Sequence, residues 1–456
     1  MLALSAPALA ADANAPDPNA LFRDLFAQPA AEAGPQIRAI LAACGNDANT
    51  LRRWIAADRG YKPYRPGWQE FSSRTRHGEK VYDFDFHVRI PRGYDPQRSW
   101  PLLLAGHGQG GTGRGAGRMM EGLLGQDVEK VIIVAPTMPG PRLISTKPYQ
   151  EDVFLKPLRW AQRNLNIDDD RVAISGYSQG GHMSWHLAVM YPRHFACAVP
   201  MAGIPAFQLG PAGVDMYLQN LQHQPLWGIW GERDVAAGNA LGNVDLCRIA
   251  DAQLKKLRNK HYTGTELPGR DHGNSFPKPE AFRTYIASHR RIGPPLAFEY
   301  VFHFPHHARA YYVEATGFRR EPLDISRGHR VAVPVMRGEK PPTREELRVA
   351  MRDKLARKLY SIKVNVDPNA NQLYVRGYGL KAARVYVTEG TLKPDRPAVV
   401  KYWSRRWRGT IPASARCMLE HYARRRDASR IVFNELDCDG TAKVTVRYPA
   451  AGESSP

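Results

Sequence analysis

The chain has 456 residues, of which 43% are hydrophobic and 24% are charged, and its formal net charge is +20. This composition is that of a globular protein with one to three domains, and it excludes an intrinsically disordered chain. No apolar run approaches the roughly 18 residues of a membrane span, so we expect a soluble body without a membrane span.

The chain begins with the segment MLALSAPALAADANAPDPNA. Its short apolar stretch ends in Ala8-Leu9-Ala10, a small-x-small pattern suited to signal peptidase. We therefore expect residues 1–10 to be a signal peptide and the protein to be secreted or periplasmic in a bacterium. Because no basic n-region precedes the apolar stretch, a disordered Ala/Pro-rich start is the alternative.

The spacing of apolar residues changes twice along the chain. The spacing of apolar residues such as Leu21 and Leu25 predicts a helical N-terminal extension over residues 18–65. An alternating pattern then predicts a half-buried strand within 81–90. Short continuous apolar runs, typical of buried parallel strands, come next at 101–105, 131–135, 172–174, 196–201 and 226–230, with a further strand predicted at 262–267.

Helical patterns separate these strands, at 115–125, 151–165, 180–191, 240–259 and 278–289. The alternation predicts an α/β fold with a mainly parallel sheet over residues 66–292. In such a sheet, ligands bind beyond the carboxyl ends of the strands, so catalytic side chains are expected on the loops that follow them.

Gly293-Pro294-Pro295 marks a break, after which we predict a β-rich C-terminal module over residues 296–450. Its strands are expected near 300–304, 310–313, 360–366, 371–376, 384–388, 397–402 and 441–448, with one helix near 413–426. Residues 301–456 hold 30 Lys and Arg against 16 Asp and Glu. This excess is compatible with an acidic polysaccharide partner or with a solvated arginine-rich face. No nucleic-acid-binding module is recognisable, so nucleic acid is not an expected partner.

Three further features of the sequence bear on metal, disulfide or ligand chemistry. The five cysteines form no CxxC and no zinc-like spacing, and Cys417 and Cys438 are left open as a disulfide pair. His303, His306 and His307 cluster without a nearby carboxylate or cysteine, so no metal site is predicted there. The segment 403–408 interleaves tryptophan with arginine, and we favour an edge strand packed against the α/β region of residues 66–292 over a sugar-stacking surface.

The segment Gly176-Tyr177-Ser178-Gln179-Gly180 lies between an apolar run and a helical pattern. A strand, a sharp turn and a helix form the context of a nucleophile elbow, in which the strained serine needs small neighbours. Glycine stands at both required places, so Ser178 is the candidate nucleophile. A chance G-x-S-x-G match is not rare in a chain with 39 glycines, but the strand–turn–helix context strengthens this one.

A serine hydroxyl is a weak nucleophile that needs a base within reach, and the usual chain order in this fold is serine, acid, histidine. Asp234 follows one predicted strand, and His272 lies on a loop after the next. We therefore predict Asp234 as the acid and His272 as the base. Other candidates are weaker, because His261 begins a strand, Asp271 directly precedes His272 and Asp245 falls within a predicted helix.

Acyl transfer also needs hydrogen-bond donors for the developing oxyanion. The segment GHGQGG, residues 106–111, is a glycine-rich turn after an early predicted strand. We predict that the backbone N–H groups of Gln109 and of Gln179, the residue after the nucleophile, form the oxyanion hole. A phosphate-binding loop is the alternative, but the segment lacks the Lys-Ser/Thr ending of a P-loop and no G-x-G-x-x-G unit follows it.

Residues 80–290 resemble an α/β-hydrolase, and they are similar to the secreted bacterial esterases grouped with poly(3-hydroxybutyrate) depolymerase-like, feruloyl-esterase-like and prolyl oligopeptidase-like proteins. The resemblance rests on GHGQGG, DDDRVAISGYSQGGHMSWHLA, YPRHFACAVPMAG, WGERD and GRDHG. It implies a metal-free, cofactor-free serine hydrolase that acts through an acyl-enzyme, with Ser178, Asp234 and His272 in the catalytic roles. These motifs specify the superfamily and not a substrate.

We therefore expect an exported carboxylic ester hydrolase acting on a small-molecule or polymeric ester. A serine peptidase of prolyl oligopeptidase type is one alternative, although such enzymes usually carry a large β-propeller and only about 80 residues precede the hydrolase segment. A non-catalytic protein that binds acidic glycans through its basic module is another. The substrate and the oligomeric state are left open by the sequence.

Overall fold

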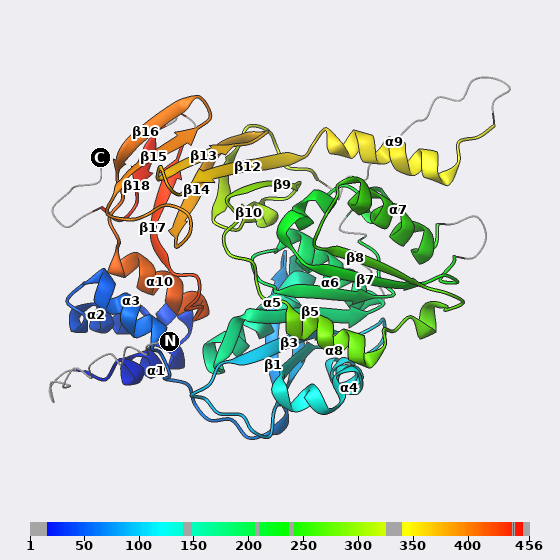
Figure 1. Cartoon of the computed structure of the whole chain (residues 1–456), viewed down its shortest axis with the longest axis horizontal. Coiled ribbons are helices and arrows are strands. Elements are labelled where there is room, and N and C mark those ends of the chain that lie inside the picture. The colour runs from blue at the N-terminus through cyan, green and yellow to red at the C-terminus, as the bar shows by residue number, and fades with distance from the viewer. Residues whose placement is uncertain are drawn as a thin grey trace, which may run out of the picture.

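The computed structural model describes residues 16–139, 148–205, 209–236, 241–324, 340–439, 441 and 443–449, so the predicted signal peptide lies outside the described residues. The described chain consists of an eight-stranded sheet with flanking helices, a group of N-terminal helices, and two five-stranded sheets with their own helices (Figure 1). Within these ranges, no helix combines the length and the apolar character needed to cross a membrane.

The eight-stranded sheet has the order β1-β2-β4-β3-β5-β6-β7-β8. Neighbouring strands from β4 to β8 run parallel, whereas β1, β2 and β4 pair antiparallel. The strands are β1 Gly67–His77, β2 Lys80–Ile90, β3 Trp100–Gly106, β4 Ile132–Pro136, β5 Ile167–Tyr177, β6 Cys197–Met201, β7 Leu226–Gly231 and β8 Tyr262–Leu267.

Helices cover both faces of this sheet, which explains the continuous apolar runs of its central strands. On β3, Leu103 packs with Met120 and Phe282 on one side, whereas Leu104 packs with Phe154 on the other. The first face carries α4 Gly113–Leu124 and α8 Pro279–Ser288, and the second carries α5 Pro148–Asn164, α6 Gln179–Met190 and α7 Asn243–Lys256. The sheet order and the two helical layers are those of an α/β-hydrolase, as predicted.

The C-terminal module contains two sheets, in the orders β10-β11-β14-β17-β18 and β16-β15-β13-β12-β9. Aromatic side chains join them: the ring of Phe318 lies 6.2 Å from that of Phe302 and 4.8 Å from that of Tyr360, between centroids. The strands are β9 Ala297–Phe302, β10 Arg309–Ala310, β11 Val313–Phe318, β12 Tyr360–Asp367, β13 Gln372–Arg376, β14 Leu380–Thr388, β15 Pro397–Tyr402, β16 Arg405–Thr410, β17 Val432–Cys438 and β18 Val444–Val446. The module is β-rich, as predicted.

Three elements were absent from the sequence-based description. Strand β1 pairs along its whole length with β2, but its sequence GWQEFSSRTRH lacks an apolar run because it forms the edge of the sheet. Strand β17 and helix α9, Arg344–Ala356, were also missed. The helix begins with a capping box, in which Thr343 and Glu346 bond each other's backbone N–H groups at 3.2 and 2.7 Å, and this pattern is visible in the sequence.

The N-terminal helices α1 Pro18–Ala27, α2 Gly34–Ala43 and α3 Ala48–Ala56 pack beside α10, Ala415–Arg425, which connects them to the module (Figure 1). Buried Asp58 lies at the centre of this junction. Its carboxylate accepts hydrogen bonds from Arg426 at 2.7 and 2.9 Å and from the hydroxyl of Tyr422 at 2.6 Å. A buried ion pair therefore joins the segment after α3 to the end of α10.

The structure answers one open question about the module and corrects one expectation. Cys417 and Cys438 form no disulfide, because all five cysteines are free and buried. Strand β16 is the edge strand that the 403–408 segment predicted, but it lies on the side of the module away from the eight-stranded sheet (Figure 1). The segment therefore does not pack against the hydrolase.

Candidate active site

Ser178 lies at a sharp turn between β5 and α6. Its φ of 54° and ψ of −114° belong to a strained region that an ordinary residue adopts only when its surroundings impose it. The backbone N–H of Ser178 donates to the carbonyl of Met201 on β6 at 2.9 Å, which holds the turn against the sheet. The strain presents the hydroxyl above the carboxyl end of the sheet, as in a nucleophile elbow.

Glycine is required on both sides of this turn because α6 begins in close contact with β3. A Cβ atom on Gly180 would lie 2.2 Å from the carbonyl oxygen of Gly106, and one on Gly176 would lie 2.6 Å from the backbone of Gly180. Backbone atoms cannot yield to such overlaps, so any side chain at these positions would push the helix away from the sheet. The glycines of the motif thus fix where the serine is held.

The structure brings Ser178, His272 and Asp234 together, although they lie on three separate loops. The hydroxyl of Ser178 is 2.9 Å from Nε2 of His272, and Nδ1 of His272 is 2.8 Å from Oδ2 of Asp234. Asp234 is buried at 6% exposure, whereas the side chain of His272 is 43% exposed. A continuous hydrogen-bonded path therefore runs from the hydroxyl through the imidazole to a buried carboxylate.

Asn243, the first residue of α7, contacts both Asp234 and His272, which the sequence did not indicate. Its amide nitrogen lies 3.1 Å from Oδ2 of Asp234 and 3.3 Å from Nδ1 of His272. Since Nδ1 donates its proton to Asp234, the Asn243 amide donates to the carboxylate and not to the ring. This second donor orients the Asp234 carboxylate toward His272.

Asp234 also changes the acidity of His272. The hydrogen bond to Asp234 raises the pKa of His272 above its usual value of 6.5, and the opposing effect of burial is smaller. By contrast, burial lowers the pKa of His182 to about 4, and its Nδ1 accepts the backbone N–H of Ile204 at 2.8 Å. His182 is therefore a neutral structural histidine, and His272 is the imidazole available to the hydroxyl.

The glycine-rich turn of residues 106–111 lies against the serine. A Cβ atom on Gly108 would be 3.5 Å from Cβ of Ser178. The N–H of Gly111 bonds the carbonyl of Gly108 at 3.0 Å, and Gly110 has a φ of 73°, so Gln109 occupies the first central position of a tight turn. Gln179 is the first residue of α6, where helix N–H groups point outward from the N-terminus. Both predicted donors are thus on backbone next to Ser178.

Two side chains that the sequence did not single out support this geometry. His107 bonds its own loop through Nδ1, 2.7 Å from the carbonyl of Gly108, and accepts the N–H of Met138 at Nε2, at 2.8 Å. Tyr177 donates its hydroxyl to the backbone carbonyl of His272 and stacks on Phe276. These contacts fix the glycine-rich turn and the loop that carries His272. Both residues stand inside the motifs, but nothing in the sequence marks them as supporting residues.

The structure does not bring the competing residues into the site. Asp271 accepts a hydrogen bond from the amide of Asn274 at 3.0 Å, and Asp245 caps α7 by accepting the N–H of Gly242 at 2.8 Å. The backbone of His261 pairs with Leu226 at the start of β7, away from the strand ends where Ser178 lies. Each has a local structural role.

The expectation that no carboxylate lies near the cluster of His303, His306 and His307 is wrong. Glu151, on α5, supplies the carboxylate that the sequence around His303, His306 and His307 lacks: Nε2 of His307 and of His186 lie 2.7 and 2.5 Å from its Oε1. Burial would raise the pKa of Glu151, but the two imidazoles lower it below its usual range. Because these atoms lie at hydrogen-bond distances, Glu151, His186 and His307 form a buried polar contact between the module and helices α5 and α6.

The fold and this arrangement define the class of the protein, an α/β-hydrolase with a candidate Ser-His-Asp triad. Residues 82–249, 168 of the 456, match the family model named Esterase, which is described as "Putative esterase". This match agrees with the resemblance to esterases carried by the sequence motifs. No curated protein sequence matches the chain.

Solved structures that resemble the chain include three esterases. A thermostable esterase is 20% identical over 49% of this chain and 63% of its own, with a TM-score of 0.39. A ferulic acid esterase from Anaeromyces mucronatus is 16% identical over 51% and 94%, with a TM-score of 0.35. The poly(3-hydroxybutyrate) depolymerase LpqC from Bordetella parapertussis is 18% identical over 49% and 89%, with a TM-score of 0.37. The chain spans less than two thirds of the first of these proteins.

Proposed function

We propose that the protein is a serine hydrolase that cleaves carboxylic esters through an acyl-enzyme. The observation that carries this proposal is the 2.9 and 2.8 Å hydrogen-bonded path from Ser178 through His272 to Asp234, with Ser178 held in a strained elbow. Such a path serves to activate a hydroxyl that is otherwise a weak nucleophile. The match of residues 82–249 to the esterase family model supports an ester as the substrate.

In the proposed reaction, Nε2 of His272 removes the proton of the Ser178 hydroxyl as its oxygen attacks the ester carbonyl. The N–H groups of Gln109 and Gln179 stabilise the oxyanion, and Asp234 stabilises the imidazolium. His272 then gives its proton to the leaving alcohol as the carbon–oxygen bond of the ester breaks. Water attacks the acyl-enzyme with His272 again as base, which releases the acid and restores Ser178.

A fluorophosphonate probe tests whether the serine is activated. Attack by Ser178 would form an oxygen–phosphorus bond, release fluoride and leave a stable adduct at this residue. We expect peptide mass mapping of the folded protein to find the adduct on the peptide containing Ser178, and hydrolysis of short acyl or hydroxycinnamoyl esters by the unlabelled protein.

The matched sample is the same protein labelled after thermal unfolding, in which the hydrogen-bonded path is lost and no adduct is expected. Modification of another residue, or none in the folded protein, would contradict the proposal. Cleavage of peptide amides with comparable kcat/KM would favour the peptidase alternative. Salt-sensitive binding of an acidic polysaccharide without serine reactivity would favour the binding-protein alternative.

The activity should fall toward acid pH. His272 acts as a base only when neutral, and Asp234 raises its pKa, so its protonated form persists above the usual value of 6.5. We therefore expect kcat/KM for an uncharged ester to decrease as pH falls through a midpoint above 6.5 and to level off on the alkaline side. A profile at constant ionic strength checks this, and a midpoint well below 6.5 would show that Asp234 does not act on the catalytic imidazole.

A further inference from the structure

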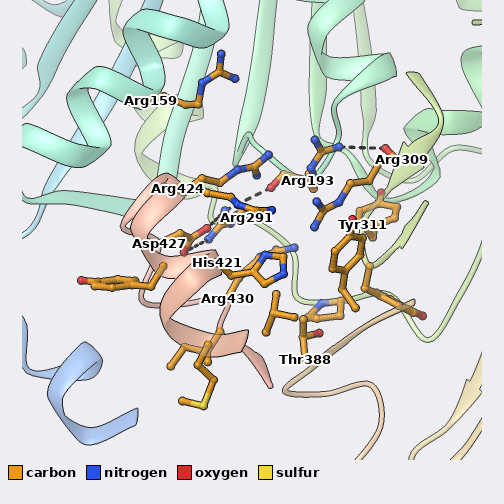
Figure 2. Close-up of a pocket in the computed structure, with 18 residues that line it drawn as sticks. Arg159, Arg193, Arg291, Arg309, Tyr311, Thr388, His421, Arg424, Asp427 and Arg430 are labelled. Carbon is orange, nitrogen blue, oxygen red and sulfur yellow. Dashed lines mark hydrogen bonds and ion pairs between the residues drawn. The ribbon is translucent and has the colours of Figure 1, made fainter. Parts of the chain in front are cut away.

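A cavity of about 320 Å³ lies at the junction between the hydrolase sheet and the module, and residues of both line it. Figure 2 shows arginines that extend from both sides toward the same space. The hydrolase side contributes Arg159, Arg193 and Arg291, and the module contributes Arg309, Arg424, Arg425 and Arg430. We call these seven residues and their cavity the arginine pocket.

The carboxylates near the arginine pocket already have hydrogen-bond partners. Asp427 is the carboxylate among the described lining residues, and its two oxygens bond the guanidinium of Arg291 at 2.8 and 3.1 Å. Arg291 takes a second carboxylate as well, that of Asp170 at 3.0 Å. His421, which also lines the cavity, is bonded to Glu435 at 2.6 Å. Arg159 pairs with Asp152 at 3.8 Å. The carboxylates therefore balance Arg291 and Arg159, and the other five arginines of the pocket form no ion pair with the described residues.

Several guanidinium groups lack the hydrogen bonds that burial demands. The Nε atoms of Arg193 and Arg309 are buried and have no partner among the described residues. Arg193 makes one bond, to the backbone carbonyl of Arg309 at 3.0 Å, and the guanidinium of Arg309 lies over the ring of Tyr386 at 3.7 Å. The half-buried side chain of Arg425 forms no ion pair or hydrogen bond with any described residue.

Repulsion among the guanidinium groups of the arginine pocket destabilises the folded protein. Burial, and next the charge of Arg309, lowers the pKa of Arg193 to about 10, and burial with Arg193 and Arg309 lowers the pKa of Arg425 well below its usual value. Arginine does not lose its proton in proteins, so the cost remains as unbalanced positive charge in a poorly solvated space. A bound anion would remove this cost.

We propose that the arginine pocket binds a small ligand carrying at least two negative charges on phosphate groups. The planar fork of a guanidinium matches two phosphate oxygens, and several forks from different directions can surround one phosphate group. The cavity volume lies at the lower end of the range of small-ligand pockets, roughly 300 to 1,000 Å³. Tyr311, Tyr312 and Tyr386 add aromatic surface to the wall, which suits a ligand with an organic portion.

The arginine pocket is separate from the proposed catalytic centre. Ser178 directly precedes the first residue of α6, Arg193 lies three residues after the last, and a 12-residue helix is about 18 Å long. The ligand would instead neutralise arginines of the hydrolase and of the module at once. It should therefore stabilise the contact between them, and its binding should not depend on the hydroxyl of Ser178.

Inorganic pyrophosphate is a suitable probe for the full-length protein. At fixed ionic strength, we expect saturable binding by calorimetry and a rise in Tm, both retained in the Ser178→Ala variant. Arg425→Gln should weaken binding about tenfold or more, since a buried hydrogen bond to a charged group is lost. Arg406→Gln on β16 is the matched control, because Arg406 is exposed and remote from the cavity, and it should bind as the parent does.

If Arg425→Gln does not fold, Arg424→Gln, an exposed position on the same helix, provides the same comparison. The proposal is overturned if Arg425→Gln and Arg406→Gln bind equally, or if potassium chloride alone reproduces the rise in Tm. Binding of citrate but not of pyrophosphate would also overturn it, by assigning the arginine pocket to carboxylates. Binding of an acidic polysaccharide without pyrophosphate binding would place the recognition on the outer surface.

Discussion

The Ser178→Ala variant is expected to lose about 10⁴- to 10⁶-fold in kcat/KM toward any ester that the parent protein cleaves, and to lose the fluorophosphonate adduct. The proposed pathway has no substitute for the attacking oxygen, because the acyl-enzyme bond forms on this atom alone. The fold should be unaffected, since alanine retains the Cβ atom and faces the same backbone strain at a φ of 54°. Steady-state kinetics of the two proteins measures the loss of kcat/KM, and their far-UV circular dichroism tests whether the fold is unchanged.

Ser184→Ala is a matched control for this experiment. Ser184 lies on the same helix, α6, and its buried hydroxyl bonds the carbonyl of Gly180 at 2.8 Å without reaching His272. We expect this variant to keep its activity within a few-fold of the parent. Ser178→Ala protein that retains most of the parental activity after repeated purification would remove Ser178 from the mechanism.

The hydrolase half of the fold was accessible from the sequence for a physical reason. Its central strands are buried on both faces, so runs such as 101–105 and 131–135 are continuously apolar and stand out from the helices between them. The loops that follow such strands meet at one edge of the sheet. For this reason, the order of serine, acid and histidine along the chain was enough to select three residues that lie within hydrogen-bond reach.

Edge and surface elements leave weaker signals. Strand β1 has a mainly polar sequence because it has a partner on one side alone, and β17 lacks clear alternation because nearly all its residues are buried. Helix α9 carries a visible capping box but few buried residues, Arg348 and Leu355 among them. Local sequence describes such elements poorly, because what stabilises them is the neighbour with which they pair.

Contacts between residues that are far apart along the chain could not be predicted from the sequence. Glu151 is 35 residues from His186 and 156 from His307, yet it bonds both. The arginine pocket gathers residues from position 159 to position 430, and its members on α10 carry in the sequence alone the pattern of an ordinary basic helix end. Asn243 and Tyr177 likewise support the candidate triad through geometry that only the fold creates.

Replacing Asp234 by asparagine should lower kcat by about 10⁴-fold near neutral pH while leaving the fold intact. In the parent, Oδ2 of Asp234 accepts both the Nδ1 proton of His272 and the amide of Asn243. An asparagine whose oxygen takes the place of Oδ2 would accept both bonds but would carry no charge to stabilise the imidazolium, and one whose NH₂ takes that place would donate to Nδ1. Nδ1 then becomes the acceptor and the proton moves to Nε2, where it prevents His272 from accepting the proton of Ser178. The loss of activity therefore comes from the missing charge in the first orientation and from the wrong tautomer in the second.

Two measurements separate this explanation from general damage to the loop. The hydrogen bond from Asp234 raises the pKa of His272, so the acid limb of the Asp234→Asn profile should shift to lower pH as activity falls. Asp271→Asn is the matched control: the adjacent carboxylate bonds Asn274 and not His272, so the same substitution there should cost no more than a few-fold. A larger loss from Asp271→Asn than from Asp234→Asn would identify Asp271 as the acid partner. An unshifted limb in Asp234→Asn would mean that the buried carboxylate supports the loop and does not act on the imidazole.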